Sequence, residues 1–193
     1  MKYFNKIDLP NYDTLLEDLN NLIKLDVLTW GPNNQICLNS LPGHEDNFHK
    51  GVGSLTLDWN NHNITSVNGI SNIEVMPKAT QLFEYEFTAL CNQFKGTIFE
   101  TLYNMLDQRY ILGRVRLMKL NPKSCLSWHT DESNRLHYPI LTQEGCLLVI
   151  EDEAMHLPLK QWYMADTTKK HTAFNGSRQS RIHLVAVILG HKS

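Results

Sequence analysis

The segment Trp128-His129-Thr130-Asp131 lies inside a series of short apolar segments that runs from Gly113 to Leu189 and decides the fold. Each segment has the length of a β-strand, and turn residues separate it from the next. About eight such strands after a helical N-terminal part predict an α+β protein that is mainly β, built as a double-stranded β-helix or jelly roll. The clearest strands are Val115-Arg116-Leu117-Met118-Lys119-Leu120 and Ile182-His183-Leu184-Val185-Ala186-Val187-Ile188-Leu189.

The N-terminal part is expected to support this β core with helices. Apolar residues recur at helical spacing over residues 12–26, and again over residues 79–108, where Gly96 is expected to separate two helices. Short strands are expected at residues 35–38 and 54–59. The polar segment at 41–49 contains two histidines and two acidic residues, but no strand or helix spacing aligns them on a metal. We expect a substrate-facing loop there instead.

The whole chain is expected to form one domain. Its 193 residues can bury one core but not two comfortable ones. We divide it into a region of helical support and substrate loops at residues 1–110 and a jelly-roll core with the metal site at residues 111–193. No internal repeat or low-complexity tract interrupts the chain.

Composition and charge exclude several classes of protein. A hydrophobic content of 42%, a charged content of 20% and a net charge of -2 are ordinary for a soluble globular protein and give no basic field for nucleic acid or an anionic membrane. The N-terminus has no apolar signal core, and no apolar run reaches membrane-spanning length. The four cysteines are scattered without a Cys-x-x-Cys pair, which indicates reduced thiols in a cytoplasmic protein. Cys125 is expected to be a small buried residue.

His129 and Asp131 stand two positions apart in the central segment. On an extended chain such side chains project to the same face, so an imidazole and a carboxylate would point to one place. Two imidazoles and one carboxylate form the set that binds non-haem Fe(II) on one face and leaves coordination positions open. The pair alone is weak evidence, because the chain has 9 His and 20 acidic residues. A strand-end histidine bonded to the backbone would account for it equally well.

His171, in His171-Thr172-Ala173-Phe174-Asn175, is the best candidate for the third ligand. After it comes Arg181, which opens the last apolar run. An arginine at the start of a barrel strand can offer two parallel hydrogen bonds to a carboxylate. This order of His-x-Asp, a distal His and then Arg is far more specific than the pair, although Arg181 could also be a surface residue at a strand start.

Residues 114–189 resemble the Fe(II)- and 2-oxoglutarate-dependent oxygenases, whose core is a cupin-like jelly roll. The similarity is closest to the aspartyl/asparaginyl β-hydroxylase-like group and to the free-proline hydroxylases. The matching segments are Arg-Leu-Met-Lys-Leu-Asn-Pro at 116–122, His-Thr-Asp at 129–131, Arg-Leu-His-Tyr-Pro-Ile at 135–140 and His-Thr-Ala-Phe-Asn-Gly-Ser-Arg-Gln-Ser-Arg-Ile-His-Leu at 171–184.

The resemblance implies a role for each matching position. His129, Asp131 and His171 would be the catalytic iron ligands, and Arg181 would hold the distal carboxylate of 2-oxoglutarate. Arg135 and His137 share a strand face and would contact the other end of this co-substrate or an acidic group of the substrate. Arg135 could instead form a structural ion pair with Glu132 or Asp131, and His137 could be a satisfied core histidine.

One position departs from the aspartyl/asparaginyl enzymes. Their best-characterised type lacks the carboxylate ligand, whereas Asp131 is present here. This residue aligns the iron site with that of the proline hydroxylases and leaves the substrate class open.

The resemblance implies a 2-oxoglutarate-dependent dioxygenase with Fe(II) as cofactor. It would hydroxylate an amino acid or a side chain of a peptide or protein, with succinate and CO₂ as co-products. We expect no nucleic-acid or membrane partner, and the exposed edges of a jelly roll make a dimer possible. The alternatives are a cupin-type metalloenzyme that does not use 2-oxoglutarate and a non-catalytic jelly roll that binds sugar or metal. Arg181 argues against the first alternative, which has no need of a carboxylate anchor.

Overall fold

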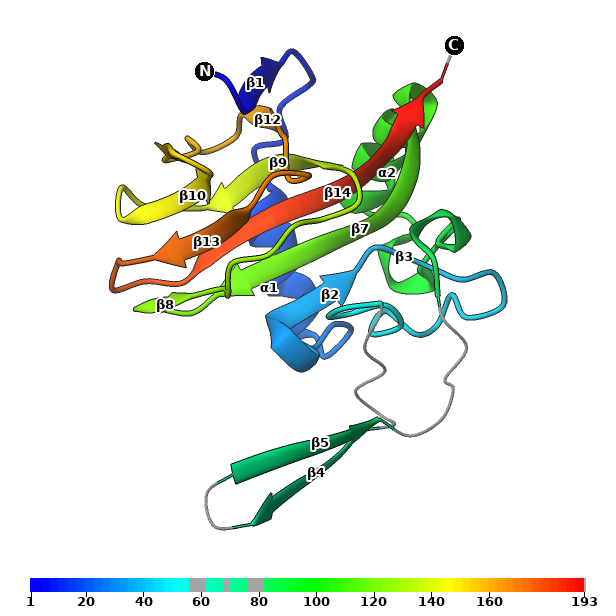
Figure 1. The fold of residues 1–193 in the computed structure, drawn as a ribbon. Coiled ribbons are helices and arrows are strands. Elements are labelled where there is room, and N and C mark those ends of the chain that lie inside the picture. The colour runs from blue at the N-terminus through cyan, green and yellow to red at the C-terminus, as the bar shows by residue number, and fades with distance from the viewer. Residues whose placement is uncertain (56–61, 68–69, 76–81, 193) are drawn as a thin grey trace.

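A computed structural model describes residues 1–55, 62–67, 70–75 and 82–192. Its largest element is a six-stranded antiparallel sheet in the order β1-β12-β9-β14-β7-β2, crossed from end to end by β7 and β14 (Figure 1). The strands of this sheet are β1 (Phe4–Ile7), β2 (Gln35–Cys37), β7 (Tyr110–Leu120), β9 (Asn134–Leu141), β12 (Trp162–Ala165) and β14 (Arg181–His191).

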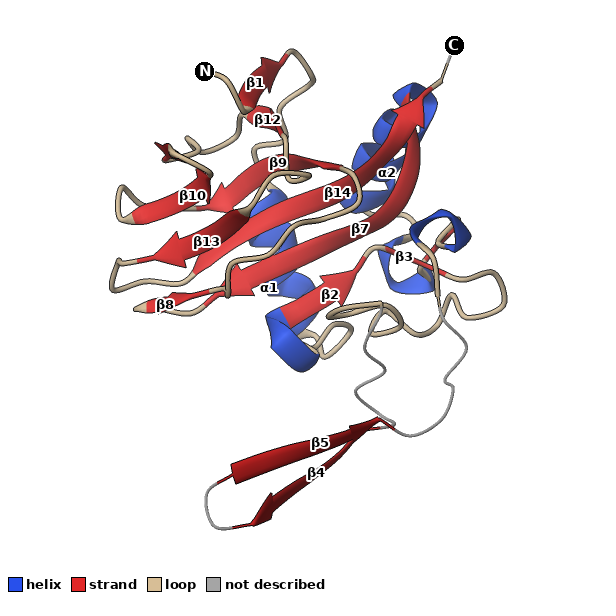
Figure 2. Cartoon of the chain, in the orientation of Figure 1, coloured by secondary structure: helices blue, strands red, loops and turns tan. Residues whose placement is uncertain are grey.

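A second, four-stranded antiparallel sheet has the order β11-β10-β13-β8. It consists of β8 (Ser124–Cys125), β10 (Cys146–Ile150), β11 (Glu153–Met155) and β13 (His171–Asn175). The eight strands from β7 to β14 are therefore divided between the two sheets in two groups of four (Figure 2). The first, eighth, third and sixth strands lie in the larger sheet and the second, seventh, fourth and fifth in the smaller one. This connectivity is that of a jelly roll, so the predicted fold class is confirmed.

The two faces of the larger sheet differ in chemistry because side chains alternate along each strand. On β7, Val115 and Leu117 belong to the main hydrophobic core, whereas Arg114 and Arg116 line a cavity on the other face. The register places Val185 of β14 opposite Arg116. It also places Val185 opposite His137 of β9, so these three residues form one row on the cavity face.

Two helices cover the apolar face of the larger sheet (Figure 1). The first, α1 (Leu15–Lys24), lies within the predicted residues 12–26, and Leu15 and Leu19 are its buried residues. The second, α2 (Ile98–Arg109), is capped at its start by the Thr97 hydroxyl, which accepts a hydrogen bond from the Phe99 amide. Gly96 precedes this cap with a φ of 74°, a conformation in which glycine has no steric penalty.

The helix expected just before Gly96 is not present in the described residues 82–95. That segment contains the short turns η3 (Glu84–Glu86) and η4 (Asn92–Phe94) and the two-residue strand β6 (Ala89–Leu90), which pairs with β3 (Asn39–Ser40). The apolar spacing wrongly predicted a helix because Phe87 and Phe94 are each buried separately and not as parts of one helix. In addition, the Glu84 carboxylate accepts hydrogen bonds from the Arg114 backbone and side chain, which ties the segment to the sheet.

Two further features of the fold concern Pro139 and the strand expected at residues 54–59. Pro139 lies in β9, which runs between β12 and β14 and is therefore not an edge strand. The proline fits there because the pairing of β9 with β12 ends at His137, and the pairing of β9 with β14 shifts register beside Pro139. Of the strand expected at 54–59, the first two residues are not in a strand and the rest lie outside the described residues.

The remaining elements are η1 (Pro32–Asn34) and a hairpin of β4 (His62–Val67) and β5 (Ile70–Val75).

All four cysteines are free, as expected, but Cys125 is exposed rather than buried. It lies at the end of β8, a two-residue strand at the edge of the smaller sheet. Among the described residues, no helix combines the length and the apolar character needed to cross a membrane.

The packing of sheet on helices predicts where the fold is vulnerable. Leu184 is fully buried in the main core, so Leu184→Ala should lower the free energy of unfolding by about 2–5 kcal/mol through lost contacts and a residual cavity. Leu189 on the same strand is 39% exposed, and Leu189→Ala should change it by less than about 1 kcal/mol. Chemical denaturation measures both values. Equal losses in the two variants would contradict the described core.

Candidate active site

A cavity of about 770 Å³ opens between residues of the two sheets. The larger sheet contributes alternate side chains of β7, β9 and β14, and the smaller sheet contributes β10 and β13. Binding sites for small molecules have comparable volumes. All six residues predicted to form the site line this one cavity: His129, Asp131, Arg135, His137, His171 and Arg181.

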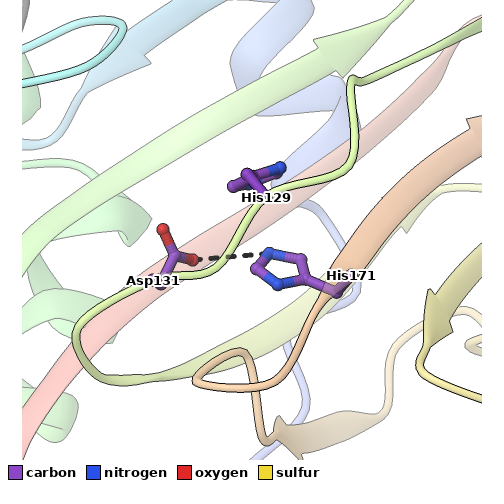
Figure 3. Close-up of side chains that lie close together, drawn as sticks. All are labelled: His129, Asp131 and His171. Carbon is purple, nitrogen blue, oxygen red and sulfur yellow. Dashed lines mark ion pairs between the residues drawn. The ribbon is translucent and has the colours of Figure 1, made fainter.

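His129, Asp131 and His171 meet at one side of the cavity (Figure 3). One potential ligand atom from each residue lies within 4.8 Å of the others. His129 and His171 form a β-bridge, with backbone hydrogen bonds of 3.0 and 2.8 Å, and their rings are 4.2 Å apart. Asp131 Oδ2 is 3.5 Å from His171 Nε2. The segment after β8 thus places His129 and Asp131 next to the start of β13.

Backbone hydrogen bonds set the orientation of both imidazoles. His129 Nδ1 lies 2.8 Å from the Ser127 carbonyl oxygen, and His171 Nδ1 lies 2.9 Å from the Lys169 carbonyl oxygen. A carbonyl oxygen only accepts, so each Nδ1 carries the proton and each Nε2 keeps its lone pair. Metal-binding histidines are typically fixed in this way by a hydrogen bond from the other ring nitrogen.

Charge and burial favour the protonation states that a metal requires. Burial, together with the nearby His129, holds the pKa of His171 below its ordinary value even though the Lys169 carbonyl and Asp131 oppose the shift. Burial would raise the pKa of Asp131, but its hydrogen bond and ion pair with Arg135 outweigh burial and lower the pKa. At neutral pH the site therefore offers a neutral His171 imidazole and the Asp131 carboxylate, which are ligands of divalent transition metals.

Arg181 begins β14 and is buried at 6% exposure. Among the described residues its hydrogen-bond partner is His183, whose imidazole nitrogens lie 2.9 and 2.7 Å from Arg181 Nε and Nη2. Burial and the Arg181 charge hold the pKa of His183 well below its ordinary value, so this imidazole is neutral. Arg181 thus has no acidic partner in the described part of the chain, and burial lowers its pKa to about 10.

Arg135 is engaged by carboxylates of the protein. Its Nε donates to Asp131 Oδ2 at 2.9 Å, and its Nη1 lies 3.4 Å from Glu84 Oε1. The structural ion pair with Asp131, one of the two partners considered from the sequence, is therefore present. A contact of Arg135 with a co-substrate stays a prediction.

His137 is fully enclosed at the cavity wall, and neither ring nitrogen has a hydrogen-bond partner among the described residues. It is therefore not a satisfied core histidine. Burial, reinforced by the Arg181 charge, lowers its pKa to about 3, so the ring is neutral. Buried polar atoms of this kind normally find a partner, which is consistent with a ligand-binding role, although that role stays a prediction.

Asn175 ends the strand that carries His171 and fixes the turn toward Arg181. Its amide group donates to the carbonyl oxygens of Leu120, Asn121 and Gln179 at 2.8–3.1 Å. These bonds join the turn after β13 to the end of β7. Asn175 therefore has a structural role in this turn.

Four charged residues of the cavity lining received no role from the sequence: Glu84, Arg114, Arg116 and Lys119. The signal that could have identified the two arginines is their alternation on β7, the same pattern that singled out Arg135 and His137. Glu84 had no such signal, because it reaches the cavity from an irregular segment far from the matching motifs. The polar loop at 41–49 does not contribute to the lining of this cavity.

Comparison with known proteins places these residues in a family context. The family model described as aspartyl/asparaginyl beta-hydroxylase matches residues 39–189, which include every residue of the predicted site. No curated protein matches the chain.

Similar solved structures include a cupin domain from Bordetella pertussis, at 17% identity and a TM-score of 0.35 over 44% of this chain and 83% of that one. A cupin-2 domain protein from Shewanella frigidimarina is 15% identical, with a TM-score of 0.34 over 50% and 97% of the two chains. An oxidoreductase of the 2OG-Fe(II) oxygenase family from Burkholderia pseudomallei is 11% identical, with a TM-score of 0.36 over 46% and 47%. The matched region spans about half the length of this last protein.

The buried charges of the cavity predict a pH-dependent stability. Burial opposes the charge of Glu84, but its hydrogen bond and ion pair with Arg114, and the charges of Arg135 and Arg116, hold its pKa below the ordinary value of 4.5. A lowered folded-state pKa contributes stability above the unfolded-state pKa, and this stability is lost as pH falls through the folded-state pKa. The stability advantage of the native protein over Glu84→Gln should therefore shrink between about pH 6 and about pH 3.

Urea denaturation at several pH values measures this difference. Glu17 is exposed on α1, and Glu17→Gln serves as the matched control, with an expected difference that stays near zero throughout. A constant difference between the native protein and Glu84→Gln across the range would mean that the pKa of Glu84 is not lowered by folding.

Proposed function

The chain belongs to the aspartyl/asparaginyl beta-hydroxylase family and is a hydroxylase, and from this premise we propose that it is an Fe(II)- and 2-oxoglutarate-dependent dioxygenase. Its substrate would be an amino acid or a side chain of a peptide or protein. One observation carries the proposal: the His129–Asp131–His171 cluster lines the same cavity as Arg181, which is buried and has no acidic partner among the described residues.

The ligand set supports iron rather than a structural metal. Two imidazoles and one carboxylate occupy one face of a metal and leave positions for substrate and O₂, whereas structural zinc sites are closed by four protein ligands. Among the described residues, the possible metal-binding cluster has three members. His129, Asp131 and His171 all line the cavity, so a metal that they held would be reachable from it.

Arg181 supports a dicarboxylate co-substrate. A buried guanidinium without a carboxylate partner is costly, and a carboxylate of a bound ligand would form charge-assisted hydrogen bonds with it. His183 lies against Arg181 and restricts its orientation. In this proposal Arg181 binds the distal carboxylate of 2-oxoglutarate, and the keto-acid end lies at the metal.

Iron with 2-oxoglutarate and O₂ would supply the oxidation, in which one oxygen atom enters the succinate formed with CO₂ and the other is inserted into a C–H bond of the substrate. The residues of the chain bind and orient. His129 and His171 present Nε2 because their Nδ1 protons are held by the backbone. Arg135 holds Asp131 in its charged form.

The decisive experiment is 2-oxoglutarate turnover by the purified protein with Fe(II), ascorbate and a panel of free amino acids and peptides, with succinate as the readout. Succinate release stimulated by a panel member supports the proposal. If neither turnover nor thermal stabilisation by 2-oxoglutarate with Zn(II) occurs, the chain is a metal-binding jelly roll that does not use this co-substrate.

Removal of one imidazole should abolish tight metal binding. His171→Ala should weaken the affinity for Mn(II) by at least about tenfold, because only two ligands remain. Isothermal titration calorimetry with Mn(II) measures this loss without turnover. His44 is exposed in the loop at 41–49, and His44→Ala should bind Mn(II) as the native protein does. Equal affinity in His171→Ala and the native protein would remove His171 from the ligand set.

Arg181→Met should weaken 2-oxoglutarate binding and leave Mn(II) binding intact. Loss of one partner of a buried charge pair costs about 2–5 kcal/mol, so the apparent affinity for 2-oxoglutarate should fall by at least about thirtyfold. Arg178 is exposed, and Arg178→Met is the matched control. An unchanged affinity for 2-oxoglutarate in Arg181→Met would show that another residue holds the distal carboxylate.

A further inference from the structure

Glu84 is a largely buried carboxylate that reaches the cavity from outside the jelly roll. It belongs to the turn η3, and its side chain is 12% exposed. Its Oε2 accepts hydrogen bonds from the amide and the Nε of Arg114, both at 3.0 Å, and its Oε1 lies 2.7 Å from Arg114 Nη2. The same Oε1 lies 3.4 Å from Nη1 of Arg135. One carboxylate therefore lies between two guanidinium groups that belong to different strands of the larger sheet.

The surroundings hold the Glu84 side chain in this position. Three residues later Phe87 is fully buried, and its carbonyl oxygen accepts a hydrogen bond from the Asn39 amide group at 2.6 Å. Gly113 of β7 leaves room for the carboxylate, because a Cβ atom there would lie 2.9 Å from Glu84 Cβ and 3.0 Å from Glu84 Oε2. Both distances are shorter than the roughly 3.5–4.0 Å of an ordinary contact. The fold therefore fixes where the carboxylate lies.

Arg135 connects Glu84 to a candidate metal ligand. Its Nε donates to Asp131 Oδ2 at 2.9 Å, while its Nη1 faces Glu84. Burial would lower the pKa of Arg135, but the hydrogen bond and the charge of Asp131, followed by the charge of Glu84, raise it. Two carboxylates therefore share one guanidinium, one at Nε and the other at Nη1.

Asp131 has few other contacts that could fix its carboxylate. It lies between strands, on the segment that follows the bridge residue His129 (Figure 3). Its amide donates to the Thr167 carbonyl oxygen at 2.9 Å, which fixes the backbone but not the side chain. His171 Nε2 is 3.5 Å from Asp131 Oδ2 and is itself an acceptor when the imidazole is neutral. Among the described residues, the hydrogen bond to this carboxylate comes from Arg135, so the direction of the ligand depends on where that guanidinium lies.

The way in which Arg135 meets Asp131 matters for a metal. A guanidinium can donate two parallel hydrogen bonds to one carboxylate and then occupies both of its oxygens. In the structure the bond to Asp131 is formed by Nε, and Nη1 is turned to Glu84. A carboxylate that accepts one such bond keeps acceptor positions for a metal. Without Glu84, Asp131 is the remaining acidic partner of Arg135 among the described residues, and the freed donors would turn to it.

We propose that Glu84 is a positioning residue of the metal centre, which restrains Arg135 to one hydrogen bond with Asp131 and so keeps that carboxylate available to the metal. The inference rests on the proposed function for the presence of a metal at His129, Asp131 and His171. It adds to the site a residue from outside the jelly roll, which acts through Arg135 and not on the metal itself.

The experiment measures Mn(II) affinity by calorimetry and the visible absorption of the Co(II)-loaded protein, neither of which requires turnover. Loss of a partner that orients a metal ligand typically costs about tenfold to a hundredfold in metal affinity. Glu84 acts one contact further away, so Glu84→Gln should weaken Mn(II) binding by about three- to tenfold. The Co(II) absorption should change too, because the coordination by Asp131 changes. Glu84→Asp keeps the charge and should restore part of the affinity.

Glu86→Gln is the matched control. Glu86 belongs to the same turn, and its Oε2 accepts a hydrogen bond from the Phe83 amide at 2.6 Å. No ion pair joins it to an arginine in the described part of the chain. This variant should keep the native Mn(II) affinity and Co(II) absorption even if the turn becomes less stable. Urea denaturation of each variant shows that the protein titrated is folded.

A double-mutant cycle separates positioning from a direct effect of charge. In Arg135→Met the contact that transmits the effect is gone, so the addition of Glu84→Gln should change Mn(II) affinity by less than about twofold. A loss of equal size with and without Arg135 would mean that the charge of Glu84 acts on the metal directly through Coulomb attraction, and the proposal would be wrong.

Two further results would overturn the proposal. One is native affinity and native absorption in folded Glu84→Gln, and the other is an equal loss in Glu86→Gln, which would assign the effect to the stability of the turn. If the native protein binds metal but not 2-oxoglutarate, the proposed function fails and the cycle still tests Glu84. If the native protein binds neither Mn(II) nor Co(II), both fail.

Discussion

The pairing of β14 with β7 on one side and with β9 on the other is the constraint on which the rest of this structure depends. Because side chains alternate along paired strands, this register gives the central sheet one apolar face and one face with buried charges. The apolar face packs on α1 and α2 and supplies most of the core. The same backbone hydrogen bonds that hold the core together therefore also determine which residues face the cavity.

Burial of four arginines around one cavity is unfavourable unless each finds a partner. The protein provides part of the compensation itself. Glu84 reaches in from outside the jelly roll to Arg114 and Arg135, and Asp131 neutralises Arg135 from the metal side. The network ties the ligand Asp131 to the irregular segment around η3. It also restricts where ligands can add negative charge, since Arg116 and Arg181 remain without acidic partners in the described part of the chain.

The motifs were predictable because their spacing is local. His-x-Asp fixes two residues on one extended segment, and the Arg135–His137 pair fixes two more on one strand face. The alternation of side chains along β7 is equally local, but it led only to the prediction of a strand and not to a role for Arg114 and Arg116. The absence of a helix before Gly96 was not predictable, because Phe87 and Phe94 reach the core singly from turns and imitate helical periodicity.

By itself the sequence determined the jelly-roll class, the run of strands and the residues of the His-x-Asp, distal His and Arg pattern. These follow from periodicity and from residue types, which are properties of neighbouring positions. Only the tertiary structure decided that His129 and His171 form a bridge, that Arg135 pairs with Asp131, and that Arg116 and Arg181 stand about 13 Å apart without acidic partners among the described residues. Such facts depend on which strands pair and in which register, and long-range pairing is set by the burial of the whole core rather than by any single segment.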